Sequence, residues 1–526
     1  MNAITTICWI VSFVIVTVTV TGLSRRVGWS APVVLVAVGA VVSLIPGVPT
    51  IVVQPDLILY GLLPPLLFAA ALRTPLSDIR ARGDSIILLS VCLVALTVVV
   101  VGYSVWFLLP GVTLAAAFAF GAVVAPTDAV AVTAVAGRVK LSRRVAAVLQ
   151  TESLLNDAAA LVALSASIAA IGHQVSPLSV GLEFVWAIAW GTGVGLGVGF
   201  VLGIIRKRLH APVLDTSLSF VIPYIAFIPA QLLGGSGVLA VVVAGLFLGH
   251  RSPLIQNAEA RIAELINWRT IRFLLENAVF LFIGLSLAGI LADVQSSKLG
   301  FWMIAGLSLV VLAALVVSRF ALVMLAALIY QYGPQVARDR AWGWRTSIAI
   351  SSAGIRGVVT LAAVFLLPEQ TPERALLQLL AFVVVVGTLL EGLALPAIYR
   401  RLRLPPPNAT QERVERQMLL AEAQVAGLRR LDEEVTDADE ERVVERLRAN
   451  ARFLTAALKD PAPEGAEAPP AAYNRLRRLM IEAERNAVIV ARAEGRYQDR
   501  AVRAVIAAID AEEAALRGSA SKPIEG

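Results

Sequence analysis

Thr151-Glu152-Ser153-Leu154-Leu155-Asn156-Asp157 places two carboxylates and an amide inside a long run that is otherwise mostly Ala, Leu, Val and Ile. In a membrane-spanning helix a central carboxylate costs about 2.5–3.5 kcal/mol, so such groups usually face a cavity, a partner or an ion pathway. On a helix, Glu152 and Asn156 lie one turn apart on one face. Ser153 and Asp157 lie on the neighbouring face, so one turn presents two adjacent polar pairs.

The composition indicates the class of protein. The chain has 526 residues, of which 58% are hydrophobic and 16% charged, and its mean hydropathy is +0.77. Soluble domains are typically about 45–50% apolar and 25% charged, so the composition predicts a polytopic membrane protein. The net charge of +7 comes from Lys and Arg scattered over short loops, which favours membrane orientation over a nucleic-acid groove. Both cysteines lie in apolar segments, so neither a disulfide framework nor a metal cofactor is expected.

Apolar segments of spanning length, about 17–25 residues, recur as far as residue 403. They predict an all-α polytopic membrane protein with about 13 transmembrane helices. These lie near residues 3–23, 30–47, 56–72, 84–109, 112–137, 144–171, 181–205, 213–232, 236–249, 272–292, 299–330, 342–367 and 374–399. Beyond them the chain becomes polar with helical periodicity. We expect a transmembrane domain over 1–403 and a cytosolic helical tail over 404–526, in which no catalytic or nucleotide motif is recognisable.

Basic residues fall in alternate loops. They include Arg25, Arg73, Arg138, Lys140, Arg206, Lys207, Arg251, Arg338, Arg345 and Arg400. The intervening loops carry hardly any Lys or Arg. Cytoplasmic loops carry the excess of Lys and Arg, so we expect the N-terminus outside and the C-terminus in the cytoplasm.

Two of the expected spans are interrupted. The fifth contains Ala125-Pro126-Thr127-Asp128, and the twelfth contains Ser351-Ser352-Ala353-Gly354-Ile355-Arg356-Gly357. Proline removes a backbone donor and glycine loosens a helix, and non-helical backbone at this depth survives only where it lines a cavity or is buried in protein. The two spans are an odd number apart, so they cross the membrane in opposite directions. An inverted repeat with two broken, crossing helices is the best sequence indication of a secondary transporter's binding site.

A glycine series lies in the seventh expected span, at Gly191, Gly193, Gly195, Gly197 and Gly199. It does not match the nucleotide-binding pattern G-x-G-x-x-G. Glycines four residues apart are typical of close helix packing, and we expect that role here.

The intramembrane carboxylates carry the candidate chemistry. A carboxylate in a water-accessible pocket can hold either a proton or a small cation, and this competition is the minimum requirement for exchange. Asp157 is the candidate carrier, with Asp128, Thr127 and Ser153 as oxygen ligands suited to a hard cation such as Na+. If one carboxylate takes either one proton or one monovalent cation, and the carrier moves only when loaded, net charge does not change across the cycle.

Other polar groups are expected to support this site. Asn156 is assigned to the scaffold, and Glu152 is expected to pair with Arg356, which would neutralise two costly charges. Arg319 is expected to snorkel or to bind the backbone of a broken helix. Asp128 has an alternative role as a cap on the second half of its broken helix. For Glu391 the pattern indicates no partner.

Four motifs occur in this order: Leu-Pro-Pro-Leu-Leu-Phe (63–68), Ala-Pro-Thr-Asp-Ala-Val-Ala (125–131), Thr-Glu-Ser-Leu-Leu-Asn-Asp-Ala (151–158) and Gly-Ile-Arg-Gly-Val-Val-Thr-Leu-Ala (354–362). Together they resemble the monovalent cation:proton antiporters of the NhaP/NHE type, in their bacterial branch. The resemblance covers about residues 5–403. It implies an inverted-repeat fold of 13 helices, a homodimer with dimerisation and core domains, and elevator-like alternating access.

The resemblance also implies roles for single residues. Asp157 would carry the ion and the proton, Asp128, Thr127 and Ser153 would line the site, and Glu152 would pair with Arg356. Members with Asn before the key Asp exchange one cation for one proton, and Asn156 places the chain among them. The expected setting is the bacterial inner membrane, with Na+, H+ and lipid as partners, no nucleic acid, and a tail that is a candidate for binding a regulator. Glu391 departs from the family's usual glutamine.

Several alternatives stay open. K+/H+ exchange, or broad selectivity over Li+, Na+ and K+, is the nearest, because selectivity depends on cavity dimensions. An intramembrane aspartyl protease would use two aspartates as a dyad, but no Gly-x-Gly-Asp accompanies Asp128 or Asp157. A membrane sensor would depend on its cytosolic tail, whereas transport should survive deletion of a tail that is only regulatory or oligomerising. An ion channel would pass net current, whereas an electroneutral exchanger would not.

Overall fold

The structure is a computed structural model that describes residues 3–45, 57–76, 79, 83–128, 132, 143–171, 177–294, 300–332, 343–403, 409–436, 439–459, 469–494 and 499–520. Over these residues the secondary structure is helical, without strands. The chain forms two compact units, Met1–Pro407 and Asn408–Gly526. Parts of the basic loops used above for orientation, at 133–142 and 333–342, lie outside the described residues.

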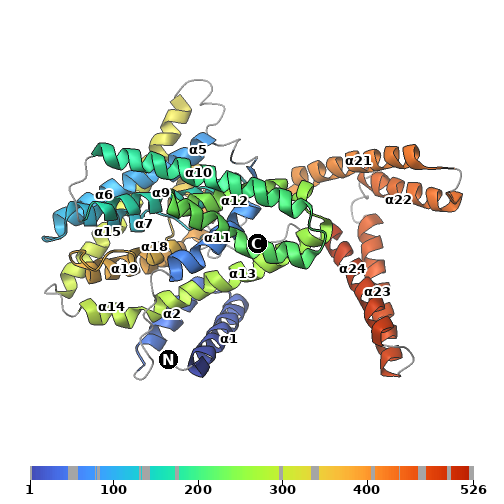
Figure 1. The fold of residues 1–526 in the computed structure, drawn as a ribbon, viewed down its shortest axis with the longest axis horizontal. Helices are drawn as coiled ribbons and strands as arrows, with labels where there is room; N and C mark the ends of the chain where they lie inside the picture. The colour runs from blue at the N-terminus through green and yellow to red at the C-terminus, as the bar shows by residue number, and fades with distance from the viewer. Residues whose placement is uncertain are drawn as a thin grey trace. The chain divides into compact units, whose positions relative to one another are not determined.

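Figure 1 shows the helices of the first unit. Those before the first interruption are α1 (Ala3–Val27), α2 (Ala31–Ser43), α3 (Leu63–Arg73, preceded by a π-helical turn Leu57–Leu62), α5 (Gly83–Ile87), α6 (Leu93–Leu108, preceded by a π-helical turn Leu88–Cys92) and α7 (Leu114–Val124). Those after it are α9 (Arg143–Ala169), α10 (Pro177–Lys207), α11 (Pro212–Leu232), α12 (Gly237–Ile255), α13 (Ala258–Leu285), α14 (Leu287–Val294), α15 (Phe301–Tyr332), α17 (Trp344–Ser352), α18 (Val358–Val364), α19 (Arg374–Gly392) and α20 (Leu395–Leu402).

These helices form an integral, multi-pass membrane protein. In the described part of the chain, eight helices are long and apolar enough to span a membrane. Four shorter apolar helices accompany them, at Val11–Ser24, Ala31–Ser43, Tyr60–Arg73 and Leu114–Val124. The expected fifth and twelfth spans do not appear as single long helices, because α7 ends at Val124 and the segment between α17 and α18 is unwound. The total of 13 spans and the inverted repeat stay predictions.

The glycine series packs α10 against α12, and the two helices lie side by side in Figure 1. A Cβ atom added to Gly191 would lie 2.7 Å from the carbonyl oxygen of Ser236, and one added to Gly195 would lie 2.6 Å from that of Ala240. Real Cβ atoms do not approach so closely, so only glycine permits this contact. The prediction of close helix packing is confirmed.

A buried polar network joins the ends of α10, α11, α12 and α13. Arg206, at 1% exposure, donates to both carboxylate oxygens of Asp215 (2.8 and 2.7 Å) and to Glu264 (2.7 Å). Gln256 donates to the same two carboxylates, at 2.7 and 3.1 Å. Because each buried charge here is hydrogen-bonded to an opposite charge, removal of Arg206 would leave two carboxylates uncompensated.

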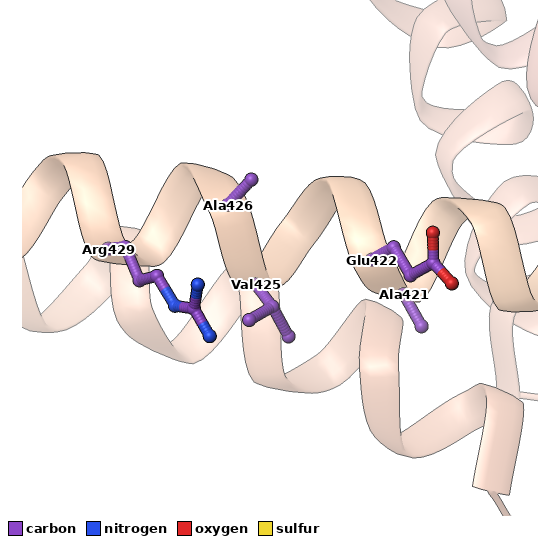
Figure 2. Close-up of a pocket in the computed structure, with 5 residues that line it drawn as sticks. All are labelled: Ala421, Glu422, Val425, Ala426 and Arg429. Carbon is purple, nitrogen blue, oxygen red and sulfur yellow. The ribbon is translucent and has the colours of Figure 1, made fainter.

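The second unit consists of α21 (Ala409–Glu434), α22 (Glu441–Lys459), α23 (Pro469–Ala493) and α24 (Asp499–Ala520). α21 packs on α22, and α23 packs on α24 around Ile481, Val502 and Ile509. A shallow hollow of about 400 Å³ lies on α21 (Figure 2). It is lined by Ala421, Glu422, Val425, Ala426 and Arg429. None of the intramembrane carboxylates lines this hollow, so we assign it no part in ion binding.

Candidate ion-binding site

The two interrupted helices meet at their unwound segments. Residues 125–128 follow the end of α7 without regular secondary structure, and residues 353–357 separate α17 from α18. The backbone N–H of Asp128 donates to the carbonyl oxygen of Ile355 at 2.8 Å. A Cβ on Gly357 would lie 2.0 Å from Oδ2 of Asp128, so glycine is required where the two segments cross. The crossing therefore places Asp128 against the second interruption.

Two arginines donate to backbone carbonyl groups at the carboxyl ends of α7 and α17. Nη1 of Arg356 donates to the carbonyl oxygen of Ala125, at the end of α7, over 2.5 Å. Nε and Nη2 of Arg319 donate to the carbonyl oxygen of Ile350, in the last turn of α17, at 3.1 and 3.0 Å. A cation at the carboxyl end of a helix is favourable because the helix dipole is negative there. Each half-helix is thus closed by one guanidinium.

Glu152 does not form the expected direct ion pair with Arg356, which interacts with it through charge alone. Glu152, at 0% exposure, pairs with Arg319 instead, through Nη1–Oε1 at 2.5 Å and Nη2–Oε2 at 3.0 Å. Arg356 directs its guanidinium to Ala125 and its backbone N–H to Oγ1 of Thr388, at 3.0 Å. The prediction that Arg319 binds the backbone of a broken helix is confirmed, whereas snorkelling is wrong because Arg319 is only 1% exposed.

The ion pair also orients Thr127. The Thr127 hydroxyl donates to Oε1 of Glu152 at 3.0 Å and accepts a hydrogen bond from Nδ2 of Asn156 at 2.7 Å. A hydroxyl has one proton and two lone pairs, so one lone pair is left after these two bonds. Arg319, Glu152 and Asn156 together fix the direction of that lone pair. The side chains assigned to the scaffold therefore contact a candidate ligand.

Asp157 differs from the other buried charges of this region. Its side chain lies on α9 at 7% exposure. In the described part of the chain it has no hydrogen bond or ion pair, and the charged group that acts on it is the half-buried Asp128. Ser153, also half-buried, lies one turn before Asp157 on α9. The carboxylates of Asp157 and Asp128 and the Ser153 hydroxyl are the oxygen donors expected from the sequence.

The structure adds residues that the sequence did not single out. Thr388 on α19 holds the backbone of Arg356, Ser90 donates to the carbonyl oxygen of Glu152 at 3.4 Å, and Tyr399 donates to that of Ala349 at 3.2 Å. Single hydroxyls in apolar helices give no signal of the helix they will face. Glu391 is exposed in the last turn of α19, within electrostatic range of Arg356 and Arg319.

Comparisons with known proteins agree with this geometry. Residues 12–401 match the family model described as "Sodium/hydrogen exchanger, transmembrane". An uncharacterized Na+/H+ exchanger of Mycobacterium tuberculosis is 30% identical over 96% of this chain and 95% of that protein. A sodium, potassium, lithium and rubidium/H+ antiporter of Bacillus subtilis is 30% identical over 68% of this chain and 56% of that protein.

The structure of the sodium proton antiporter MjNhaP1 from Methanocaldococcus jannaschii is similar in fold. The TM-score is 0.60, with 18% identity, over 77% of this chain and 99% of that one. At this identity the similarity concerns the helical fold alone. The family match over most of the first unit, with the two interruptions crossing as described, leads to one conclusion. The chain belongs to the transmembrane sodium/hydrogen exchanger family and is a cation/proton antiporter, a secondary transporter and not an enzyme.

Proposed function

We propose that the protein exchanges Na+ for H+ at a one-to-one ratio, with Asp157 binding the cation and the proton in turn. The observation that carries this proposal is the buried carboxylate of Asp157, which has no hydrogen-bonding partner in the described part of the chain and lies in range of Asp128. An unpaired buried carboxylate is costly unless a proton or a cation neutralises it. Either ligand satisfies Asp157, and this supports the competition on which exchange depends.

The proposed cation ligands are oxygens of Asp157, Asp128, Ser153 and Thr127. Hard cations prefer carboxylate, hydroxyl and carbonyl oxygens. The remaining lone pair of Thr127 is available because its proton is held by Glu152 and its other lone pair by Asn156. In this proposal Asn156, Glu152 and Arg319 position a ligand, and Arg356 holds the crossing together.

The charge balance supports an electroneutral cycle. Glu152 and Arg319 form a pair of zero net charge, and Arg356 is bound to a carbonyl at the negative end of α7. The net charge of the site is then the same whether Asp157 holds one Na+ or one proton. A carrier that moves only when loaded would therefore move the same charge in both directions.

We further propose that the protein works as a homodimer with elevator-type alternating access, in a bacterial inner membrane with the N-terminus outside and the C-terminus in the cytoplasm. The polar network of the site draws on residues 125–127, α9, α15, α17, α19 and residues 353–357. None of its members belongs to α10, α11 or α12, which pack on each other. This separation supports a moving core beside a second group of helices.

Proteoliposomes loaded with a pH dye test the proposal. An acid-inside gradient is imposed, Na+ or K+ is added outside, and the voltage is clamped or left free. Wild type should alkalinise rapidly with Na+, independently of voltage, and Asp157→Asn should not. Glu183→Gln, which removes an exposed carboxylate from α10, is the matched control and should retain exchange. No cation response in folded protein would reject antiport, and voltage-dependent exchange would reject the one-to-one ratio.

A second candidate is exchange of K+ or of several monovalent cations. It is favoured by the Bacillus subtilis relative, whose name includes sodium, potassium, lithium and rubidium. The same assay separates the two, because a response to K+ equal to or greater than that to Na+ assigns the broader selectivity.

A further inference from the structure

α10 and α12 run parallel, and their contact is less close toward their carboxyl ends. The distance from an added Cβ to the nearest atom of α12 or its cap is 2.7 Å at Gly191, 2.6 Å at Gly195 and 3.0 Å at Gly199. At Gly203 it is 3.8 Å, an ordinary van der Waals distance. α10 and α12 are thus in tight contact from Gly191 to Gly199 and in ordinary van der Waals contact at Gly203.

A groove of about 400 Å³ is lined by the carboxyl-terminal parts of α10 and α12. Its walls are apolar, formed mainly by Phe200, Ile204, Phe247 and Leu254, with Gly203 in its lining. Phe200 is 55% exposed and Leu254 77% exposed, so the walls continue into the lipid-facing surface. A lipid acyl chain is the apolar occupant that a membrane supplies at such a surface.

Two cations stand in the lining of the groove. Lys207 is the last residue of α10, and Arg251 lies in the last part of α12 with its guanidinium 5.1 Å from the centre of the Phe247 ring. No acidic residue lines the groove. Both helix ends belong to the basic loops that the charge pattern assigns to the cytoplasm, where lipid headgroups lie. Lys and Arg attract anionic headgroups at this depth.

We propose that this groove binds one acidic phospholipid of the cytoplasmic leaflet, with an acyl chain along the apolar walls and the phosphate between Lys207 and Arg251. The apolar walls favour a lipid over a soluble anion, and the two cations without a carboxylate favour an acidic headgroup over a zwitterionic one. The proposal is independent of the transported cation, because the groove shares no residue with the ion site.

Native mass spectrometry of the full-length protein in detergent tests the proposal, with phosphatidylglycerol and phosphatidylcholine as probes. Phosphatidylglycerol should be retained and phosphatidylcholine should not. Each cation is expected to contribute roughly fivefold in affinity, so Lys207→Gln with Arg251→Gln should weaken phosphatidylglycerol binding about thirtyfold. Arg208→Gln is the matched control, since Arg208 is an exposed neighbour that does not line the groove. It should change the affinity less than threefold, roughly.

A second pair of variants tests the groove without changing charge. Gly203→Ile should fill it and displace the lipid, whereas Gly203→Ala should not, because a Cβ there meets no close contact. Equal retention of both lipids, or unchanged phosphatidylglycerol affinity in the double charge variant or in Gly203→Ile, would overturn the proposal. Excess inorganic phosphate that displaces the lipid would overturn the choice of a lipid over a soluble anion. Loss of oligomers in the charge variant without lipid would assign the groove to contact between copies of the chain.

Discussion

Replacing either partner of the Glu152–Arg319 ion pair should destabilise the protein more than any exposed substitution, and the two replacements should not be additive. The variants are Glu152→Gln, Arg319→Met and the double variant. Both side chains are at most 2% exposed, and two hydrogen bonds join them. Gln at 152 keeps an acceptor for Thr127, and the contact of Arg319 with Ile350 is lost equally in the single and the double variant.

The expected magnitude follows from burial. Removing one partner of a buried pair costs about 3–5 kcal/mol, because the other charge is left uncompensated. An unfolding entropy of about 2 cal/mol/K per residue over about 400 residues converts this into a fall in melting temperature of about 4–6 °C. Two hydrogen bonds between charged groups should give a coupling of about 2–3 kcal/mol, so the double variant should melt about 2–4 °C above the sum of the single effects.

Melting of purified protein in detergent, followed by intrinsic fluorescence, measures these shifts. A second cycle with Arg356→Met tests the pairing that the sequence predicted. Its coupling with Glu152→Gln should be smaller than that of Arg319→Met, because Arg356 interacts with Glu152 through charge without a hydrogen bond. A coupling of Glu152 with Arg356 that equals or exceeds the coupling with Arg319 would refute the pairing described here.

Three further outcomes are expected. Gly357→Ala should reduce exchange in proteoliposomes at least tenfold, roughly the effect of 1.4 kcal/mol, because the added Cβ would collide with Asp128. Gly193→Ala is the control and should retain exchange, because its Cβ meets nothing within 4 Å. Equal exchange rates in the two variants would contradict the crossing geometry. Thr127→Val should raise the half-saturating Na+ concentration about tenfold through loss of one oxygen ligand, and Thr127→Ser should restore it; an unchanged value would remove Thr127 from the site. In the tail, Arg477 donates to Glu512 at 2.6 Å and holds the pKa of that carboxyl below its usual range. This lowered pKa means that the pair stabilises the packing of α23 on α24 above the ordinary glutamate pKa of about 4.3 and ceases to do so as the pH falls through the folded value. Arg477→Gln should therefore speed hydrogen exchange of α23 in the full-length protein at pH 7, and this effect should shrink as the pH falls below the ordinary glutamate pKa. An effect of equal size at every pH would contradict the assignment.

The sequence predicted the structure best at residues that are energetically unfavourable in a membrane-spanning helix. Carboxylates in apolar segments, proline and glycine at span depth, and glycines four apart all indicate a feature before any contact is known. They predicted the unwound segments around Thr127 and Arg356 and the packing of α10 on α12.

The partners of long charged side chains were not predictable in the same way. Arg319 and Arg356 are both arginines in apolar spans, and the choice between them for Glu152 depends on which helix faces α9. Which helix faces α9 is a property of three-dimensional packing. Arg319, on α15, is separated from Glu152 by 167 positions in the sequence. Thr388 and Tyr399 were missed for the same reason.

Holding both guanidiniums on carbonyl oxygens has a consequence for affinity. A guanidinium that could reach Asp157 would compete with Na+ for this carboxylate. Because it belongs to the same chain, its effective concentration would be roughly millimolar or more, independent of the ion concentrations in the cell. The carbonyl oxygens of Ala125 and Ile350 keep Arg356 and Arg319 occupied elsewhere. The two broken helix ends therefore protect the proposed Na+ site from competition by the protein's own positive charge.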